Sequence, residues 1–442
     1  MLLGFFMILV DSTIVSVAIP AISEGLSASY NEVIWVNSAY LLAYAVPLLI
    51  TGRLGDRFGP RTIYLIGLTL FTASSFACGL AETAGQLIAA RAFQGFGGAL
   101  VTPQTMSVMI RTFSPRERGT AMGLWGATAG LATITGPLLG GVLVDAAGWP
   151  WIFFVNVPLG AIGLVLAWIF VPRLERTNRH FDWAGMALSA VGMFCLVFGL
   201  QEAENFGWDW RVWALIGGGL AATAAFFWWQ GRRGQEALVP LQLFDDRNFT
   251  LAGATIATVG FAVSTFAIPW MIYVQTAREY SPTLAALLIA PSGLISALLS
   301  PRIGKLTNTN DPKPIAIAGL SITAASIAGT ALITFPGIDP KWMFVASIFY
   351  GIGNSMMWGP LSMVATRNLD PRLAGAGSSV YNTMRQIGAV IGSAAVAAMM
   401  TAQLNQHDVT AAMRNTLWLP AAVIALGALL ACFFAKTKSW NS

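Results

Sequence analysis

Two charged residues lie within long apolar runs, and they are the side chains of this chain best placed to do chemistry. Asp11 lies in the run that begins at Met1, and Arg91 lies in the segment LIAARAFQGFGG. A carboxylate in an apolar medium needs a wet cavity, a cationic partner or a bound proton for part of the time. All three conditions suit a group that binds a proton in one conformation and releases it in another.

Both charges also have a purely structural interpretation. Asp11 could bond neighbouring helices without ever titrating, and Arg91 could bind backbone carbonyls or an adjacent helix. The functional hypothesis makes Asp11 a proton-coupling carboxylate. It gives Arg91 the task of tuning the electrostatics around Asp11, with a bridging water as one route.

A polar segment, GRLGDRFGPR at 52–61, separates the second and third apolar runs and is predicted to be a loop. Its basic residues could serve topology alone, but an acid among them is more than topology requires. Asp56 can pair with cations or cap a helix N-terminus in another part of the molecule, and such a bond would break when the two parts separate. We therefore expect a gate, whose members are Gly52, Arg53, Asp56, Arg57, Gly59 and Arg61.

Small residues recur along the fifth apolar run at a spacing that lets a neighbouring helix approach closely. Pro137 follows Gly136 and removes a backbone donor, which predicts a bend there. Such a seam could be a hinge between two halves of the molecule, or simply tight packing. The small residues are Gly126, Gly130, Gly136, Gly140 and Gly141.

The elements that position these residues are predicted to be membrane-spanning helices. The 442 residues are 56% apolar and only 10% charged, whereas soluble domains are about 25% charged. The first run has no basic n-region or small-residue cleavage site, so we expect a retained helix rather than a signal peptide. Fourteen spans are predicted, near 1–22, 33–51, 62–80, 84–108, 119–144, 151–171, 183–201, 211–230, 249–274, 284–303, 314–335, 341–365, 373–401 and 416–435.

Basic residues divide unequally between the two sides of these spans. An even number of spans puts both termini on one side, and that side holds nineteen Lys and Arg in its loops against four on the other. The positive-inside rule makes the first side cytoplasmic, in a multi-pass protein of the plasma (inner) membrane. It also explains the net charge of +5 without a nucleic-acid partner. Two basic residues remain inside spans, Arg91 and Arg385.

An internal repeat defines the domain organisation. The segment RTFSPRERG at 111–119 is matched 256 residues later by RNLDPRLAG at 367–375, and GRLGDRFGPR is matched in degraded form by GKLTNTNDPK at 304–313. We expect an N-terminal six-helix bundle at 1–180, two inserted helices at 181–231, an amphipathic cytoplasmic linker at 232–248 and a C-terminal six-helix bundle at 249–442. Parallel repeats around a central site suit alternating access.

Several kinds of chemistry are not indicated. Cys78, Cys195 and Cys432 lie in apolar runs without disulfide or metal-ligand spacing, and they are expected to be buried small hydrophobic residues. We find neither a clustered catalytic set nor the GxxxxGK[ST] loop of ATP-binding proteins. We therefore expect no enzyme, no catalytic or metal site and no cofactor, and the proton gradient as the energy source.

Four motifs resemble those of the major facilitator superfamily, in the family's order and across nearly the whole chain. GRLGDRFGPR resembles its signature loop, RAFQGFGGA its fourth-helix motif, GLATITGPLLGG its antiporter motif, and MILVDSTIVSVAIP the first helix of its fourteen-helix drug/proton antiporters. The resemblance implies that Asp11 and Arg91 couple protons and that Asp56 and Arg57 belong to a cytoplasmic gate. It further implies that Gly136 and Pro137 form the antiporter hinge.

The sequence departs from that group in two ways. Asn308 and Thr309 stand in the second half where Asp56 and Arg57 stand in the first, so a symmetric gate is not expected. The second-half spans carry no acid, which argues against divalent cationic substrates.

The expected partners are the lipid bilayer, protons and a small amphipathic substrate, bound by a protein that functions as a monomer. The leading hypothesis is export of drugs or related compounds in exchange for protons. The alternative is an exporter on the same fold for one endogenous metabolite, lipid, siderophore, amino acid or peptide. Aromatic and amide groups within spans could contact either cargo. These candidates are Asn37, Tyr40, Trp270, Tyr273, Trp358 and Asn382.

Overall fold

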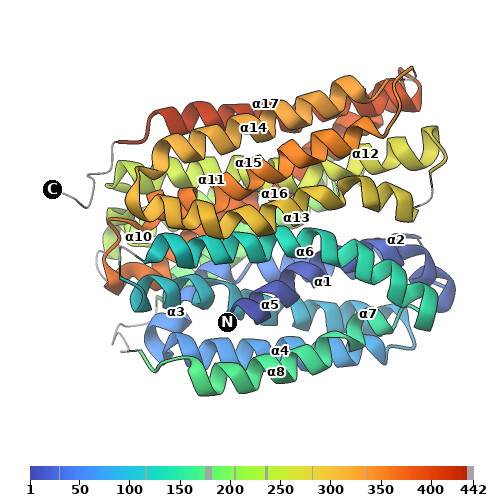
Figure 1. The fold of residues 1–442 in the computed structure, drawn as a ribbon. Helices are drawn as coiled ribbons and strands as arrows, with labels where there is room; N and C mark the ends of the chain where they lie inside the picture. Colours follow the sequence, from blue (N-terminus) through green and yellow to red (C-terminus); the bar gives the residue numbers. More distant parts are fainter. Residues whose placement is uncertain are drawn as a thin grey trace.

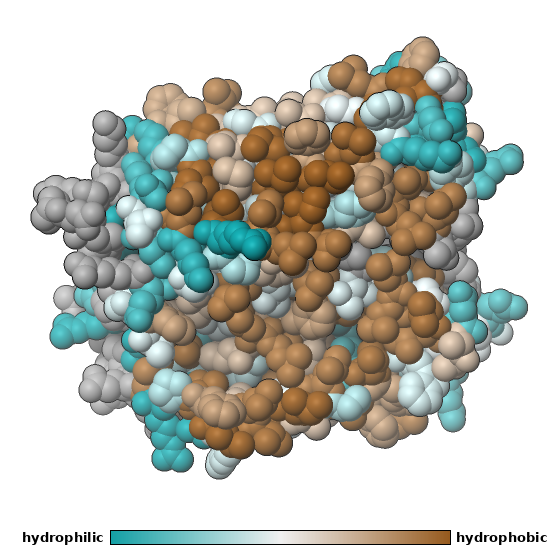
Figure 2. Space-filling model, in the orientation of Figure 1, coloured by the Kyte–Doolittle hydropathy of each residue, from teal (hydrophilic) through white to brown (hydrophobic). Residues whose placement is uncertain are grey.

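The computed structural model describes residues 1–28, 30–114, 117–174, 182–203, 206–233, 237–280, 282–335 and 337–435. The chain is all-helical there, and its long helices run side by side between the same two ends of the molecule (Figure 1). Apolar side chains cover a broad band of the surface, and most polar ones lie toward the two ends (Figure 2). The fold is that of a protein whose middle lies in lipid.

The N-terminal half occupies one side of the molecule (Figure 1). Its helices are α1 (Leu2–Gly25), α2 (Tyr30–Ala45), α3 (Leu48–Phe58), α4 (Pro60–Gly79), α5 (Ala84–Thr112), α6 (Arg118–Ala147), α7 (Trp151–Phe154) and α8 (Asn156–Phe170). Two of the predicted spans are bent. The axis of α1 turns by 51° between Val15 and Val17, and the axes of α2 and α3 differ by 47°.

The C-terminal half lies beside the first (Figure 1). It is built from α11 (Arg247–Thr265), α12 (Ala267–Ile272), the π-helical turn η3 (Tyr273–Ala277), α13 (Pro282–Thr309), α14 (Pro312–Ile333), α15 (Trp342–Thr366), η4 (Pro371–Leu373), α16 (Ala374–Leu404) and α17 (Val409–Cys432). Of the three cysteines, Cys78 is buried, Cys195 is only partly buried and Cys432 at the end of α17 is exposed, so the expectation of three buried cysteines is confirmed for Cys78 alone.

Two further helices, α9 (Trp183–Gln201) and α10 (Trp210–Arg233), connect the halves in sequence. Met193 and Val197 of α9 pack with Ala45 of α2 and Val390 of α16, so α9 covers a place where the halves meet. The chain then continues through the short helix η2 (Leu241–Phe244) into α11. The predicted linker lies here, although its residues 234–236 fall outside the described part.

Side chains with oxygen acceptors begin five of the described helices, where the first backbone N–H groups have no partner within the helix. Four of these caps are aspartates, which places much of the acidic charge at helix ends rather than inside spans. The capping residues are Thr83, Asp182, Asp246, Asp311 and Asp408.

Within the described residues, ten helices are long and apolar enough to cross a membrane, or twelve if each bent pair is one span. The long helices α5 and α15 are not among them, because glycine and polar residues lower their mean hydropathy. The predicted all-helical, multi-pass fold is thus confirmed. The count of fourteen stays a prediction.

The segment GRLGDRFGPR is not a loop, and that expectation was wrong. The helix α3 continues through it to Phe58, Gly59 turns the chain with φ of +92°, and Pro60 begins α4. A glycine with positive φ, followed by proline at the first helical position, joins the two helices through a single residue. The polar segment is therefore the end of α3, a one-residue turn and the start of α4.

Candidate functional site

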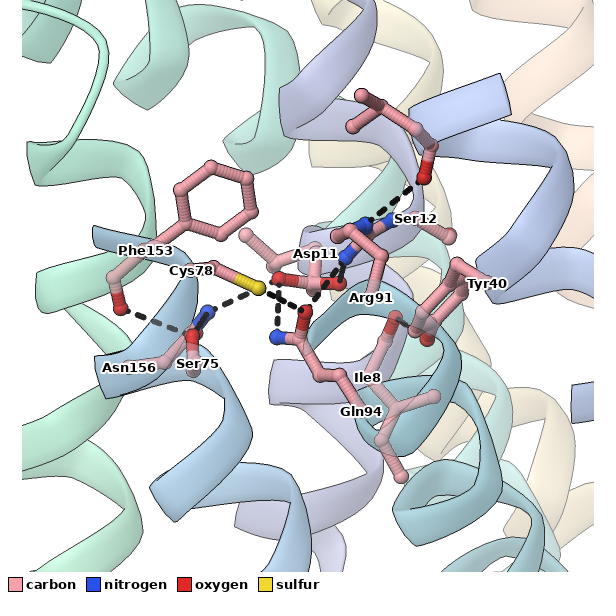
Figure 3. A network of polar contacts seen from close by, with 12 residues as sticks. Ile8, Asp11, Ser12, Tyr40, Ser75, Cys78, Arg91, Gln94, Phe153 and Asn156 are labelled. Carbon is pink, nitrogen blue, oxygen red and sulfur yellow. Dashed lines mark hydrogen bonds and ion pairs between the residues drawn. The ribbon is translucent and has the colours of Figure 1, made fainter. Parts of the chain in front are cut away.

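Asp11 and Arg91 lie together at the centre of the N-terminal half, and both side chains are fully buried. Arg91 Nη1 donates to Asp11 Oδ2 over 2.5 Å, Gln94 Nε2 donates to Oδ1 over 2.8 Å and Asn156 Nδ2 donates to Oδ1 over 3.0 Å. Figure 3 shows these side chains converging on the carboxylate from three directions. Since all three partners donate, the arrangement is the one an ionised carboxylate requires.

Arg91 is held by more than its ion pair. Its Nε donates to the carbonyl of Val36 over 3.3 Å, and Nη1 also donates to Gln94 Oε1 over 2.7 Å. Its guanidinium carbon lies 4.0 Å from the centre of the Tyr40 ring, within the range of a cation–π contact. Arg91 therefore acts on Asp11 by direct contact, and the water suggested from sequence is not required.

A second layer orients these donors. Asn156 Nδ2 also reaches Ser75 Oγ at 3.1 Å, and Ser75 donates to the carbonyl of Phe153 over 2.9 Å. Tyr40 donates to the carbonyl of Ile8, one turn before Asp11 (Figure 3). The cluster draws on α1, α2, α4, α5, α7 and α8, all of which belong to the N-terminal half.

Sequence reasoning missed Gln94 and Asn156. Gln94 stands three residues after Arg91 on the same helix, a spacing that places two side chains on one face. Asn156 is a buried amide that begins an apolar helix, and a polar side chain there needs a partner. Both signals are in the sequence, but neither indicates which distant residue the amide will meet.

The predicted gate residue Asp56 contacts the other half of the molecule. Its side chain is 4% exposed and lies so close to Gly375, in the first turn of α16, that a Cβ at Gly375 would overlap the carboxylate. Gly52 approaches Ser379 on the same helix in the same way. A carboxylate at a helix N-terminus is stabilised by the helix dipole.

The other gate residues make different contacts. Arg53 Nε donates to the carbonyl of Leu238 in the linker over 2.9 Å. Arg61 donates to the carbonyl of Trp168, and its guanidinium lies 5.1 Å from the centre of that ring. Arg57 stacks on Phe58 at 5.6 Å. Only part of the motif therefore faces the second half.

The degraded copy of the motif occupies the equivalent place in the second half. Asn308 Nδ2 donates to Thr120 Oγ1 over 2.8 Å, and a Cβ at Gly119 would overlap the Asn308 amide. Gly119 and Gly375 are the matching glycines of the 256-residue repeat, whose residues Pro115 and Arg116 lie outside the described part. The two contacts are alike in geometry but differ in charge.

The predicted hinge residues pack mainly within the N-terminal half. Gly136 and Gly140 of α6 face Thr13 and Ile14 of α1, with no room for a Cβ at Gly136. Pro137 lies inside α6. This part of α6 therefore contacts the helix that carries Asp11.

The earlier part of α6 packs against the C-terminal half. A Cβ at Gly130 would lie 2.5 Å from Ser296 Oγ, and one at Gly126 would lie 3.2 Å from Trp358 Cβ. Gly141 faces open space. The helix α6 thus touches the other half with its first turns and α1 with its later turns.

Two of the six candidate substrate residues lie where the halves meet. Trp358 is 6.1 Å from Trp125 between ring centres, in a T-shaped arrangement. Asn382 Nδ2 approaches Met106 Sδ at 3.8 Å. Trp125, Trp358 and Met106 belong to one buried apolar cluster.

The remaining candidates lie elsewhere. Tyr40 belongs to the Asp11 cluster, and Asn37 is partly buried three residues before it. Trp270 and Tyr273 are buried in a separate core formed by the C-terminal half, which includes Leu417 of α17. The structure thus does not gather the six residues into one site.

Two packed halves of long apolar helices define a multi-pass membrane protein, and comparison with known proteins places it among transporters rather than enzymes. The sequence profile of the Major Facilitator Superfamily matches residues 1–393. The chain belongs to this superfamily.

Curated relatives from bacteria agree with this assignment. An uncharacterized MFS-type transporter of Mycobacterium tuberculosis, Rv1250, is 47% identical over 91% of this chain and 70% of its own length. The multidrug resistance protein Stp of the same species is 34% identical over 91% and 75%. The tetracenomycin C resistance and export protein of Streptomyces glaucescens is 32% identical over 91% and 75%.

Solved structures show the same fold. The proton:xylose symporter XylE bound to 6-bromo-6-deoxy-D-glucose superposes with a TM-score of 0.71 and covers 99% of this chain and 95% of its own. Its sequence identity is 16%, so the likeness extends to the fold alone.

Proposed function

We propose that the chain exports amphipathic drugs or related small molecules across the plasma membrane in exchange for protons, by alternating access and as a monomer. The proposal counts α5 and α15 as spans, which gives fourteen, and places both termini in the cytoplasm. It is carried by the burial of Asp11 among three donors. Burial of a carboxylate this far from water is costly, and ionisable residues kept inside membrane spans commonly belong to proton or ion pathways.

Protonation would change the balance of forces at this cluster. A neutral Asp11 no longer compensates the charge of Arg91, which would keep only Gln94 Oε1, the Val36 carbonyl and the Tyr40 ring. Because a guanidinium buried away from water is costly without a counter-charge, protonation of Asp11 favours another arrangement of α1 and α5.

A route from Asp11 to the second half runs through α6. Thr13, two residues after Asp11, packs on Gly136 of α6, and Phe5 stacks on Trp125 of the same helix at 4.8 Å. Trp125 in turn contacts Trp358 of α15. A shift of α1 on protonation would therefore displace the helix that forms much of the seam between the halves.

The names of the relatives support export. One is named for multidrug resistance and another for resistance to and export of tetracenomycin C. The second name also supports the alternative of a single dedicated metabolite. Accumulation assays with a lipophilic monocation, a lipophilic monoanion and a panel of metabolites separate the two, since strict preference for one metabolite excludes the multidrug function.

Proteoliposomes with an imposed pH gradient test the coupling. We expect Asp11→Asn to abolish gradient-driven transport, measured both as substrate flux and as the accompanying proton flux. The matched control is Asp145→Asn, which neutralises an exposed acid near the end of α6 and should behave as wild type. Coupled transport that survives Asp11→Asn unchanged would refute the proposed mechanism.

A further inference from the structure

A third charged side chain in the spans, Arg385, has no part in the mechanism above. It lies in α16, three residues after Asn382 and seven after Ser378. Helical spacing of this kind places Ser378, Asn382 and Arg385 along one face. The C-terminal half thus presents a polar stripe that ends in a guanidinium.

The contacts of this stripe show that it faces the N-terminal half. Ser378 donates to the carbonyl of Pro103 over 3.1 Å, and Asn382 reaches Met106. Arg385 Nη2 lies 3.4 Å from the hydroxyl of Tyr44 in α2. Arg385 therefore lies between the halves, where alternating access would expose a bound molecule.

Within the described part of the chain, no carboxylate compensates the charge of Arg385. None of the carboxylates in the described ranges lies within 4.0 Å of its guanidinium, and α11 to α17 contain no Asp or Glu between their ends. Asp11 is already bound by Arg91 and two amides. Among the described residues, Arg385 has a polar contact with Tyr44, which is neutral, and 3.4 Å is long for a hydrogen bond.

A partly buried guanidinium of this kind favours an anion. Its planar fork of donors fits a carboxylate in two parallel hydrogen bonds, and burial strengthens the attraction. One turn away, Asn382 Oδ1 is buried and has no hydrogen-bond partner among the described residues, so it can accept from a donor on the same ligand. Met106 joins this region to the aromatic cluster of Trp125 and Trp358.

We propose that Arg385 binds the anionic group of the transported molecule, so that the preferred substrates are amphipathic aromatic anions bearing a carboxylate or a similar group. This proposal rests on the proposed export function, whose site it describes. The alternative is a structural Arg385 that only joins α16 to Tyr44.

Binding measurements test the proposal without a proton gradient. The purified protein in lipid nanodiscs is titrated with two matched pairs of dyes, fluorescein against rhodamine 123 and 1-pyrenebutyrate against 1-pyrenemethylammonium, after subtraction of empty nanodiscs. We expect the wild type to bind the anion of each pair at least tenfold more tightly. Arg385→Gln should remove that preference and leave the cations unaffected, and Arg385→Lys should retain part of it.

Control variants separate charge recognition from structure. Arg302→Gln removes an equal charge from an exposed position of α13 and should not change binding. Tyr44→Phe removes the hydroxyl partner and should lower anion affinity less than threefold, whereas a purely structural Arg385 predicts equal effects of Tyr44→Phe and Arg385→Gln. If Arg385→Gln fails to fold, as judged by gel filtration and thermal unfolding, Arg385→Lys takes its place. A partial loss of the anion preference in Arg385→Lys supports the proposal, and an unchanged preference overturns it.

Three results would overturn the proposal: a wild type that prefers the cations, one that binds neither anion, or unchanged anion affinity in the Arg385 variants. The coupling mechanism is tested separately, since Asp11→Asn should keep the anion preference while it loses gradient-driven transport. Failure of one therefore does not imply failure of the other.

Discussion

Replacement of Asp56 by Asn changes one charge at the place where α3 meets the first turn of α16. Asparagine keeps the shape of the side chain and one acceptor oxygen, so the substitution removes the charge together with the second acceptor. In the present structure the halves are in contact here, through Asp56 at Gly375 and Gly52 at Ser379. We expect Asp56→Asn to raise the fraction of molecules in which the two halves separate at this end.

The size of the effect follows from the burial of the carboxylate. A charge beside a helix N-terminus contributes about 0.3–1 kcal/mol when exposed and up to about 2 kcal/mol when partly buried. Asp56 is 4% exposed, which favours the upper part of that range, but asparagine retains the neutral part of the interaction. A loss of about 1 kcal/mol shifts the equilibrium between closed and open forms about fivefold.

Pulsed electron paramagnetic resonance can measure this shift. Spin labels are attached at Thr112→Cys and Arg372→Cys, two exposed positions at this end of the two halves, after replacement of the three native cysteines. The distribution of distances in detergent or nanodiscs gives the populations of the two forms. Asp56→Asn should increase the longer distance.

Two outcomes would refute the reasoning. Distance distributions of wild type and Asp56→Asn that coincide within error would mean that the Asp56 charge does not hold the halves together. A larger closed fraction in Asp56→Asn would mean that this charge pushes the halves apart. Asp145→Asn, an exposed acid distant from this contact in sequence and helix, serves as the charge control and should leave the distances unchanged.

Two further variants test packing and helix capping. Gly95→Ala should destabilise the fold by about 1–3 kcal/mol, because the new Cβ would overlap the backbone carbonyl of Tyr40. The control Gly217→Ala places its Cβ in open space and should be neutral or slightly stabilising. Thermal unfolding of the two variants measures the difference. Asp182→Ala removes the cap of α9 and should cost about 2 kcal/mol at neutral pH. Burial acts to raise the pKa of Asp182, but hydrogen bonds and a nearby arginine hold it below its ordinary value of 3.8, so the folded state favours the charged form. The stability difference from wild type should therefore be complete above pH 3.8 and shrink as pH falls below it, and a difference independent of pH would contradict this account.

Composition and local motifs were sufficient to predict the class of fold and the superfamily. Runs of apolar residues indicate helices in lipid because each span must satisfy its own backbone hydrogen bonds. The GRLGDRFGPR segment was recognisable as a motif, but its helical conformation was not, because Gly52 and Gly55 lower the helix propensity and packing against α16 and α5 outweighs that cost.

The partners of the central charges were harder to predict. Asp11 and Arg91 are eighty residues apart, and each was singled out by the cost of burying a charge. Their pairing, and the part played by Asn156, depend on contacts between helices distant in the sequence. The six candidate substrate residues were chosen by residue type alone. Residue type does not show that Trp358 lies where the halves meet, whereas Trp270 lies in a core within the C-terminal half.

The charged groups of the two proposed sites are divided between the two halves of the molecule. Asp11 and the three side chains that donate to it lie in the N-terminal half, whereas Arg385 lies in the C-terminal half. If both proposals hold, proton coupling and substrate choice depend on residues in different halves of the chain. During evolution, substitutions on α16 could then change the transported substrate without changing proton coupling. Relatives with the same coupling mechanism would in this way acquire different substrates.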